Sequence, residues 1–102
     1  MPRYFVVHCQ DAPGMQARRA ATAAAHRQYV EQHSDRIFMG GPLLDDSGSR
    51  RIGSLLVLKA TSRAEAQAFL DAEPYNLNGV FESVVIRAFE CVVHPTEANK
   101  QE

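Results

Sequence analysis

Three residues that can carry or transfer charge recur at a spacing of seven along one stretch of the chain. Arg19, His26 and His33 lie in a segment that is rich in alanine and free of Gly and Pro, which predicts a helix over 15–33. Seven residues are nearly two helical turns, so these side chains share one stripe, and Tyr29 lies one turn beyond His26 on an adjacent line. A histidine in such company can act as a general acid or base near neutral pH. An ordinary half-buried helical histidine would show the same spacing.

A second group of side chains that could take part in catalysis follows a shorter predicted helix over 63–72. This helix is preceded by Thr61-Ser62, and Glu65 three residues after Ser62 completes the pattern of a capping box. Glu73-Pro74-Tyr75 ends it, because the residue before a proline avoids helical geometry. A carboxylate held on this stiff connection can accept the N–H of an imidazole, select its tautomer and stabilise the imidazolium. The alternative is a helix stop with a solvated acid.

The histidines do not form a metal-binding pattern. Two helical histidines that share an ion stand four residues apart. His26 and His33 are seven apart, or about 10 Å along the helix axis, and neither has an acidic residue four positions away. The glycines of Gly40-Gly41-Pro42 do not match a dinucleotide-binding or phosphate-binding loop. We therefore expect neither a metal nor a cofactor.

The elements that position these residues follow the order β-α-β-β-α-β. The predicted strands are residues 3–9, 36–44, 50–60 and 82–94, and the predicted helices are residues 15–33 and 63–72. This order is typical of the split βαβ arrangement, a four-stranded antiparallel sheet with two helices on one face and the first and third strands in the centre. The predicted fold class is therefore α+β and ferredoxin-like. We expect one domain over 1–94 and a polar C-terminal tail over 95–102.

The face of the sheet away from the helices is expected to need a cover. Leu55, Leu56, Val57 and Leu58 are consecutive, so the third strand is apolar on both faces, whereas an antiparallel sheet with one wet face alternates cleanly. We therefore expect a homodimer packed through the open sheet face. Cys9 and Cys91 fall toward opposite ends of the predicted sheet, so both are expected to be free thiols.

Composition excludes several classes of protein. The chain has 102 residues, 45% of them hydrophobic, which indicates one globular domain. Its 11 basic and 12 acidic residues give a net charge of -1, without the cationic excess of proteins that bind nucleic acids or anionic membranes. With no signal peptide, no run of about 18 apolar residues and only two cysteines, we expect a cytoplasmic protein.

Several of these motifs together resemble the YciI-like (YCII-related) family. They are Arg19, Ala25-His26 with Tyr29, Gly41-Pro42, Gly53-Ser54, and Glu73-Pro74-Tyr75 followed by Gly79-Val80. Their order and spacing match the family over about residues 3–93. The resemblance implies a ferredoxin-like dimeric α/β barrel with a pocket that holds a histidine and an aspartate as a proposed catalytic pair. It also implies a lyase step, because the well-defined activity of the family is the elimination of HCl from a chlorinated hydroxyhydroquinone.

The family's functional residues carry over with two departures. His26 matches the family histidine, and Glu73 stands where the family usually has aspartate, which keeps the charge but adds a methylene. Ala23 stands where some members have an arginine. The residues that the resemblance implies as substrate-binding are Arg19, Tyr29, Gly41, Pro42, Ser54 and Tyr75.

The predicted function is a small lyase or isomerase without a cofactor. His26 would exchange a proton with a small cyclic or aromatic metabolite, and Glu73 would orient its ring. The alternative is a non-catalytic dimer that binds a small molecule or a partner protein, with His26 as a hydrogen-bonding group. A bond between His26 and the Glu73 carboxylate at an open cavity would favour catalysis.

Overall fold

The structure, a computed structural model, describes residues 3–94. Its elements are β1 (Arg3–Asp11), α1 (Gln16–Gln32), the 3-10 turn η1 (Ser34–Arg36), β2 (Ile37–Leu44), β3 (Arg51–Ala60), α2 (Arg63–Asp71), α3 (Pro74–Leu77) and β4 (Phe81–Phe89). Apart from η1 and α3, this is the order that the sequence predicts. No helix in this part of the chain combines the length and the apolar character needed to cross a membrane.

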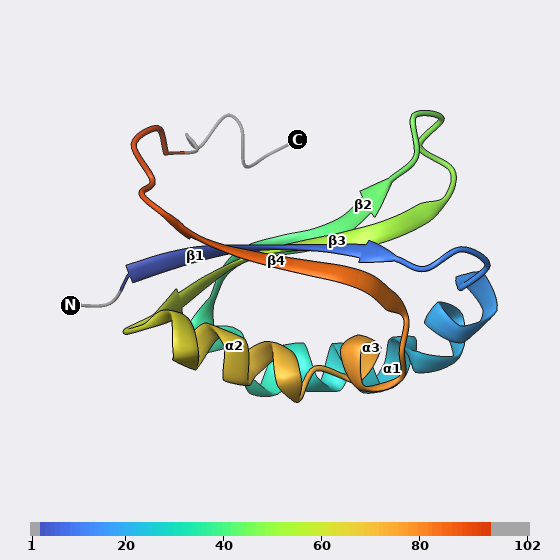
Figure 1. Cartoon of the computed structure of the whole chain (residues 1–102), viewed down its shortest axis with the longest axis horizontal. Coiled ribbons are helices and arrows are strands. Elements are labelled where there is room, and N and C mark those ends of the chain that lie inside the picture. The colour runs from blue at the N-terminus through green and yellow to red at the C-terminus, as the bar shows by residue number, and fades with distance from the viewer. Residues whose placement is uncertain (1–2, 95–102) are drawn as a thin grey trace.

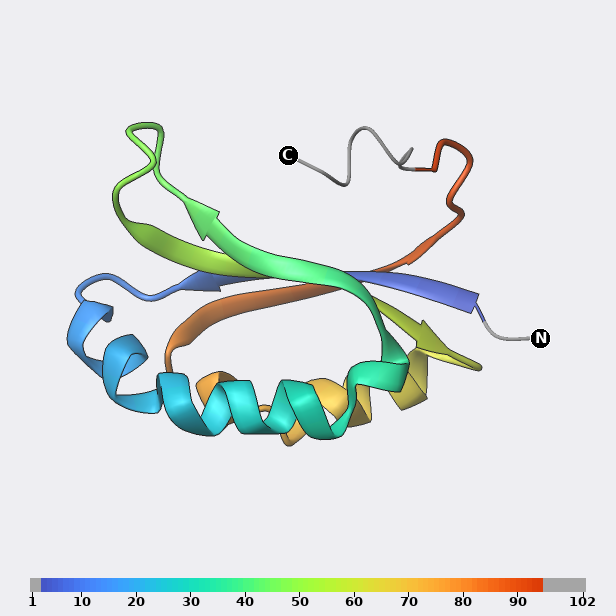
Figure 2. The same ribbon diagram turned by 180° about the vertical axis from the view of Figure 1, so that it is seen from behind.

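The strands form one antiparallel sheet in the order β2-β3-β1-β4. Val7 of β1 lies between its two register partners, Leu56 of β3 and Ile86 of β4. The predicted central position of the first and third strands is confirmed. Figures 1 and 2 show the sheet from opposite sides, with β2 and β3 continuing into a hairpin that rises away from the helices.

The helices lie together on one face of the sheet (Figure 1). Strand alternation directs Phe5, Val7 and Cys9 of β1 toward them, and all three side chains are buried. Phe69 and Leu70 of α2 pack onto this layer. The fold is therefore α+β and ferredoxin-like, as predicted.

The capping box predicted at the start of α2 is formed. The Ser62 side chain accepts a hydrogen bond from the backbone N–H of Glu65, and the Glu65 carboxylate accepts from the backbone N–H and the hydroxyl of Thr61. These bonds satisfy backbone donors that a helix N-terminus leaves without intrahelical partners.

The segment after α2 is more ordered than the predicted connection over 75–81. Glu73 is the N-cap of the short helix α3, and its side chain accepts from the backbone N–H of Tyr75 at 3.2 Å. Pro74 occupies the first helical position, where its fixed φ suits a helix and its missing N–H costs nothing. The proline that ends one helix therefore also begins the next.

The last strand is shorter than the predicted strand over 82–94. β4 ends at Phe89, which lies opposite Tyr4, and β1 itself begins at Arg3. Residues 90–94 have almost no length of β1 left with which to pair. The predicted tail over 95–102 lies outside the described residues.

The sheet face opposite the helices is apolar and exposed. Met39 of β2 is 51% exposed, and Val85 and Phe89 of β4 are also exposed. No helix among residues 3–94 covers this face (Figures 1 and 2). Both cysteines, Cys9 and Cys91, are free thiols, as predicted.

Candidate active site

A histidine and a carboxylate from distant parts of the sequence meet on the helix layer. His26 Nδ1 lies 2.6 Å from Oε1 of Glu73, which joins the middle of α1 to the N-cap of α3. An ionised carboxylate can only accept, so with Glu73 ionised Nδ1 is the donor of this hydrogen bond, and in the neutral imidazole Nε2 then keeps a lone pair. Glu73 is 1% exposed, whereas the His26 side chain is 22% exposed. The acid is thus buried behind the imidazole, and the imidazole faces outward.

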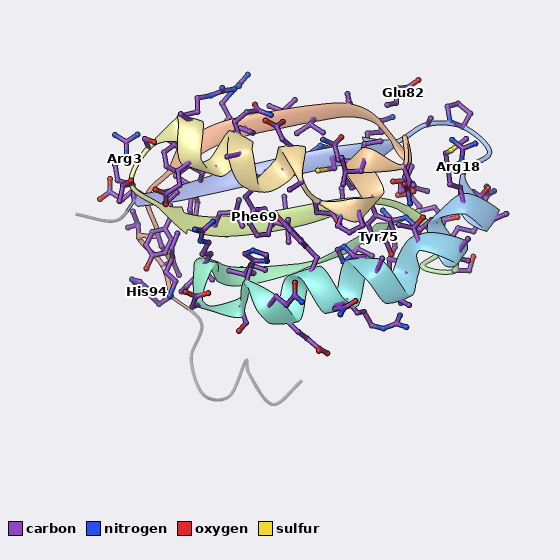
Figure 3. All side chains as sticks on the ribbon, turned by 90° about the horizontal axis from the view of Figure 1, so that it is seen from below. Arg3, Arg18, Phe69, Tyr75, Glu82 and His94 are labelled. Atoms are coloured by element: carbon purple, nitrogen blue, oxygen red, sulfur yellow. The ribbon has the colours of Figure 1, made fainter. Side chains whose placement is uncertain are left out.

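Tyr75 holds the imidazole from a second direction. Its ring stacks on that of His26, with centroids 4.2 Å apart and an angle of 23° between the planes. The guanidinium carbon of Arg19 lies 4.4 Å from the centre of the same tyrosine ring, within the range of a cation–π contact. Tyr75 belongs to α3, and Figure 3 shows it beside α1. Two contacts of different kinds therefore fix the orientation of His26.

Arg19 is fixed by a buried ion pair. Its Nε and Nη2 donate to the two carboxylate oxygens of Asp11 at 2.7 and 2.9 Å, and Nη2 also donates to Ser54 Oγ at 3.0 Å. Burial alone would lower the pKa of Arg19, but its hydrogen bond and charge interaction with Asp11 outweigh burial and raise it. Arg19 therefore acts as a permanent cation that is locally neutralised by Asp11.

These groups border a cavity of about 300 Å³ beneath β2 and β3. Its lining is Arg19, His26, Arg27, Val30, Ile37, Gly40, Gly41, Pro42, Arg51, Ser54, Leu56 and Tyr75. Six of the eight predicted site residues are among them, and a seventh, Glu73, lies behind His26. Larger hollows occur on the open sheet face and at its edge, but they contain neither member of the His26–Glu73 pair.

Comparison with known proteins now identifies the family. Residues 3–90 match the YCII-related domain. This chain belongs to the YCII-related family. It is 30% identical over 95 residues to protein YciI of Escherichia coli O6:H1, an alignment that covers 86% of this chain and 97% of the relative. Protein YciI of Shigella flexneri matches to the same extent.

Among solved structures, the YCII-related chain is similar to the 5-chloro-2-hydroxyhydroquinone dehydrochlorinase TftG of Burkholderia phenoliruptrix, in complex with 2,5-dihydroxybenzoquinone. The sequences are 29% identical, the TM-score is 0.77, and the match covers 85% of this chain and 93% of that one. A second structure, PA3566 of Pseudomonas aeruginosa, is 14% identical with a TM-score of 0.50 and covers 86% and 91% of the two chains. That second likeness is one of fold.

Tyr29 is the predicted site residue that this YCII-related structure places away from the cavity. Its hydroxyl donates to the backbone carbonyl of Phe69 at 2.8 Å, and the two rings pack at 5.0 Å. Burial, with a further contribution from the negative charge of Glu73, raises the pKa of Tyr29. Tyr29 therefore joins α1 to α2, and its side chain does not line the cavity although the next residue, Val30, does.

Three charged residues near the cavity were missed by sequence reasoning. Asp11 lies beyond the predicted strand over 3–9, but the structure makes it the last residue of β1 and pairs it with Arg19. Arg27 lies next to His26 in the chain but about 100° around the helix, and Arg51 begins β3 on the opposite wall. Only the fold brings such separated positions together, so spacing along the sequence carries no signal for them.

The buried thiol of Cys9 is unreactive at neutral pH. Burial, followed by the negative charges of Glu73 and Asp11, raises the pKa of Cys9 from 9.0 to about 12. A thiol is a nucleophile in its ionised form, so Cys9 is a packing residue at neutral pH. Within residues 3–94, no group of three His, Cys, Asp or Glu side chains is placed to hold a metal ion.

Proposed function

We propose that this YCII-related protein is a small lyase or isomerase that needs no cofactor and uses His26 to transfer a proton. The observation that carries the proposal is the 2.6 Å contact between His26 Nδ1 and Glu73 Oε1, with His26 lining a cavity. The likeness to a dehydrochlorinase at a TM-score of 0.77 supports the same class of chemistry.

The proton pathway follows from the tautomer. Nε2 of His26 takes a proton from a C–H or O–H group of the substrate, and the bonding pair left behind forms a new double bond. In a lyase step a leaving group departs with its own electron pair, and in an isomerase step the imidazolium returns the proton to another substrate atom. The buried Glu73 carboxylate stabilises the imidazolium in either case. A positioned acid–base group of this kind contributes about 10²- to 10⁴-fold in rate.

The size and lining of the cavity favour a small cyclic substrate. A volume of about 300 Å³ lies at the lower end of the range for ligand pockets. The apolar side chains of Val30, Ile37 and Leu56 line it together with the Tyr75 ring, and these surfaces suit the faces of a single ring.

We also propose that a second copy of the chain covers the open sheet face. Val6, Leu55, Val57 and Phe89 line a shallow apolar hollow there, and Met39 beside them is half exposed. Neighbouring exposed apolar side chains on one face are typical of an interaction site. A sheet-to-sheet dimer buries it on both copies with one self-complementary contact.

The test is a turnover screen with small cyclic acids, ketones and chlorinated hydroxyhydroquinones, followed by ultraviolet absorbance and chloride release. We expect turnover by the wild type, a loss of about 10²- to 10⁴-fold in His26→Ala, and near wild-type rates in His33→Ala. His33 is a matched control because it lies on the same side of the molecule but does not line the cavity. Equal rates for wild type and His26→Ala overturn the mechanism. Saturable binding of 2,5-dihydroxybenzoquinone without turnover of any compound favours the non-catalytic binding protein instead.

A further inference from the structure

The cavity has a surplus of positive charge that the proton transfer does not use. Three arginines line it, and Arg19 among them is paired with Asp11. Arg27 and Arg51 are exposed, and within residues 3–94 neither has a carboxylate oxygen within 4.0 Å. The net charge of the chain is -1, so a cavity lined by two unpaired arginines in addition to Arg19 does not follow from overall composition, although most arginines among residues 3–94 have no ion pair.

A buried hydroxyl in the same wall has a proton to donate. Ser54 is 6% exposed, and its oxygen accepts a hydrogen bond from Nη2 of Arg19 at 3.0 Å. The Ser54 O–H therefore remains as a donor, and no acceptor for it is present among the residues that the structure describes. A hydroxyl polarised in this way by a guanidinium is a good donor to a negatively charged oxygen.

His26, the group proposed to accept a proton, lines the same cavity, which therefore combines a base with a hydroxyl donor and two exposed cations. We propose that the substrate is a small cyclic oxyanion, a carboxylate or an ionised phenol, whose charged oxygen accepts from Ser54 and faces Arg27 and Arg51. This inference rests on the proposed function, because it names the substrate class of the same site. A neutral oxygen would accept a weaker hydrogen bond from Ser54 and gain nothing from the two arginines, and a cationic ring would be repelled by them.

The size of the effect follows from the exposure of the cations. Ser54 is buried and its bond to an oxyanion is charge-assisted, whereas Arg27 and Arg51 act through solvent and are screened by salt. We expect about a tenfold preference for an anion over its neutral analogue. Raising the ionic strength from 0.05 to 0.5 M should reduce the part that the arginines supply.

The experiment is a calorimetric or NMR titration of the purified protein with 2,5-dihydroxybenzoate and with 2,5-dihydroxybenzamide. The two probes have nearly the same shape and differ by one charge. Ser54→Ala and Arg51→Gln should each weaken binding of the benzoate several-fold and weaken binding of the benzamide by clearly less, because a neutral amide oxygen accepts a weaker bond and has no charge for Arg51 to attract. Arg63→Gln is the matched control, because Arg63 is an exposed cation on α2 that does not line the cavity.

The outcomes separate this inference from the proposed function. A preference for the benzoate below twofold, or no saturable binding of the benzoate, overturns the inference. Loss of the preference in Arg63→Gln also overturns it, because the effect would then come from overall charge. If His26→Gln keeps the preference while no compound is turned over by the wild type, the anion site stands and the proposed catalysis fails.

Discussion

The pairing of His26 with Glu73 predicts an energetic coupling that a double-mutant cycle can measure. Glu73→Gln keeps the shape of the side chain and an oxygen that can accept from both His26 and Tyr75, but it removes the charge. His26→Ala removes the imidazole and leaves the carboxylate buried with the Tyr75 N–H as its remaining partner. The two single variants and the double variant isolate the interaction between these side chains.

The magnitudes follow from burial. A hydrogen bond to a charged group contributes about 1.5–3 kcal/mol and a neutral one about 0.5–1.5 kcal/mol, so Glu73→Gln should lower the free energy of unfolding by about 1–2 kcal/mol. Removing one partner of a buried pair costs about 3–5 kcal/mol. His26 is 22% exposed and water can reach the vacated space, so for His26→Ala we expect a lower value of about 2–3 kcal/mol. The double variant should be more stable than additivity predicts by about 1–2 kcal/mol.

The assay is urea unfolding followed by far-ultraviolet circular dichroism at one fixed protein concentration, since the stability of a dimer depends on concentration. Glu73→Asp is a useful fourth variant, because aspartate is a good N-cap but its carboxylate ends about 1.5 Å short of His26. It should therefore retain the start of α3 and lose the contact with the imidazole. A coupling energy within about 0.3 kcal/mol of zero refutes the interpretation of this pair as an energetic unit.

Three further predictions concern the thiol, the glycines and the open face. Because the pKa of Cys9 is raised, the stability that this thiol contributes is intact below pH 9 and is lost as the pH rises toward 12. The free energy of unfolding should therefore fall more steeply above pH 9 in the wild type than in Cys9→Ala. Native wild type and native Cys9→Ala should show the same number of thiols that react with Ellman's reagent. A Cβ at Gly53 would overlap the carbonyl oxygen of Cys9, so Gly53→Ala should cost about 1–3 kcal/mol of stability in urea unfolding, whereas Gly41→Ala, which meets nothing within 4 Å, should cost less than about 1 kcal/mol. Light scattering should give twice the chain mass for the wild type and the chain mass for Val85→Lys; identical masses would contradict the proposed dimer.

Local signals in the sequence determined how much of this structure could be predicted. Each of three signals involves residues that are close together in the sequence: the alternation along a strand, the alanine-rich helix and the capping box around Ser62. These signals could therefore be interpreted without knowing the fold. The short helix α3 has one turn and therefore no periodicity to detect. Glu73 was singled out from its place between a helix and Pro74, but its pairing with His26 was predicted through the resemblance to a family, because 47 residues separate the two and spacing alone does not relate them.

The residues that escaped prediction are those whose roles depend on packing between elements. The pairing of Asp11 with Arg19 requires the start of α1 to lie over the end of β1, whereas the sequence indicates only that Asp11 follows a predicted strand and that Arg19 lies in the next helix. Arg51 reaches the cavity because β3 passes above α1, which is a property of the sheet order. The spacing of one helical turn suggests that Tyr29 acts together with His26, but the Tyr29 hydroxyl donates to the backbone carbonyl of Phe69.

The double use of Glu73 limits how this protein can evolve. One oxygen atom, Oε1, both accepts from His26 and caps α3 through the Tyr75 N–H, so most substitutions there change reactivity and folding together. Arg51 in the cavity wall caps no helix, and Ser54 meets the helix layer through one hydrogen bond from Arg19. Because proteins tolerate few destabilising changes, new substrates should arise by substitutions in that wall while the histidine and its acid stay the same. Relatives with the same pair of reactive side chains are therefore expected to differ in what they bind more than in how they move a proton.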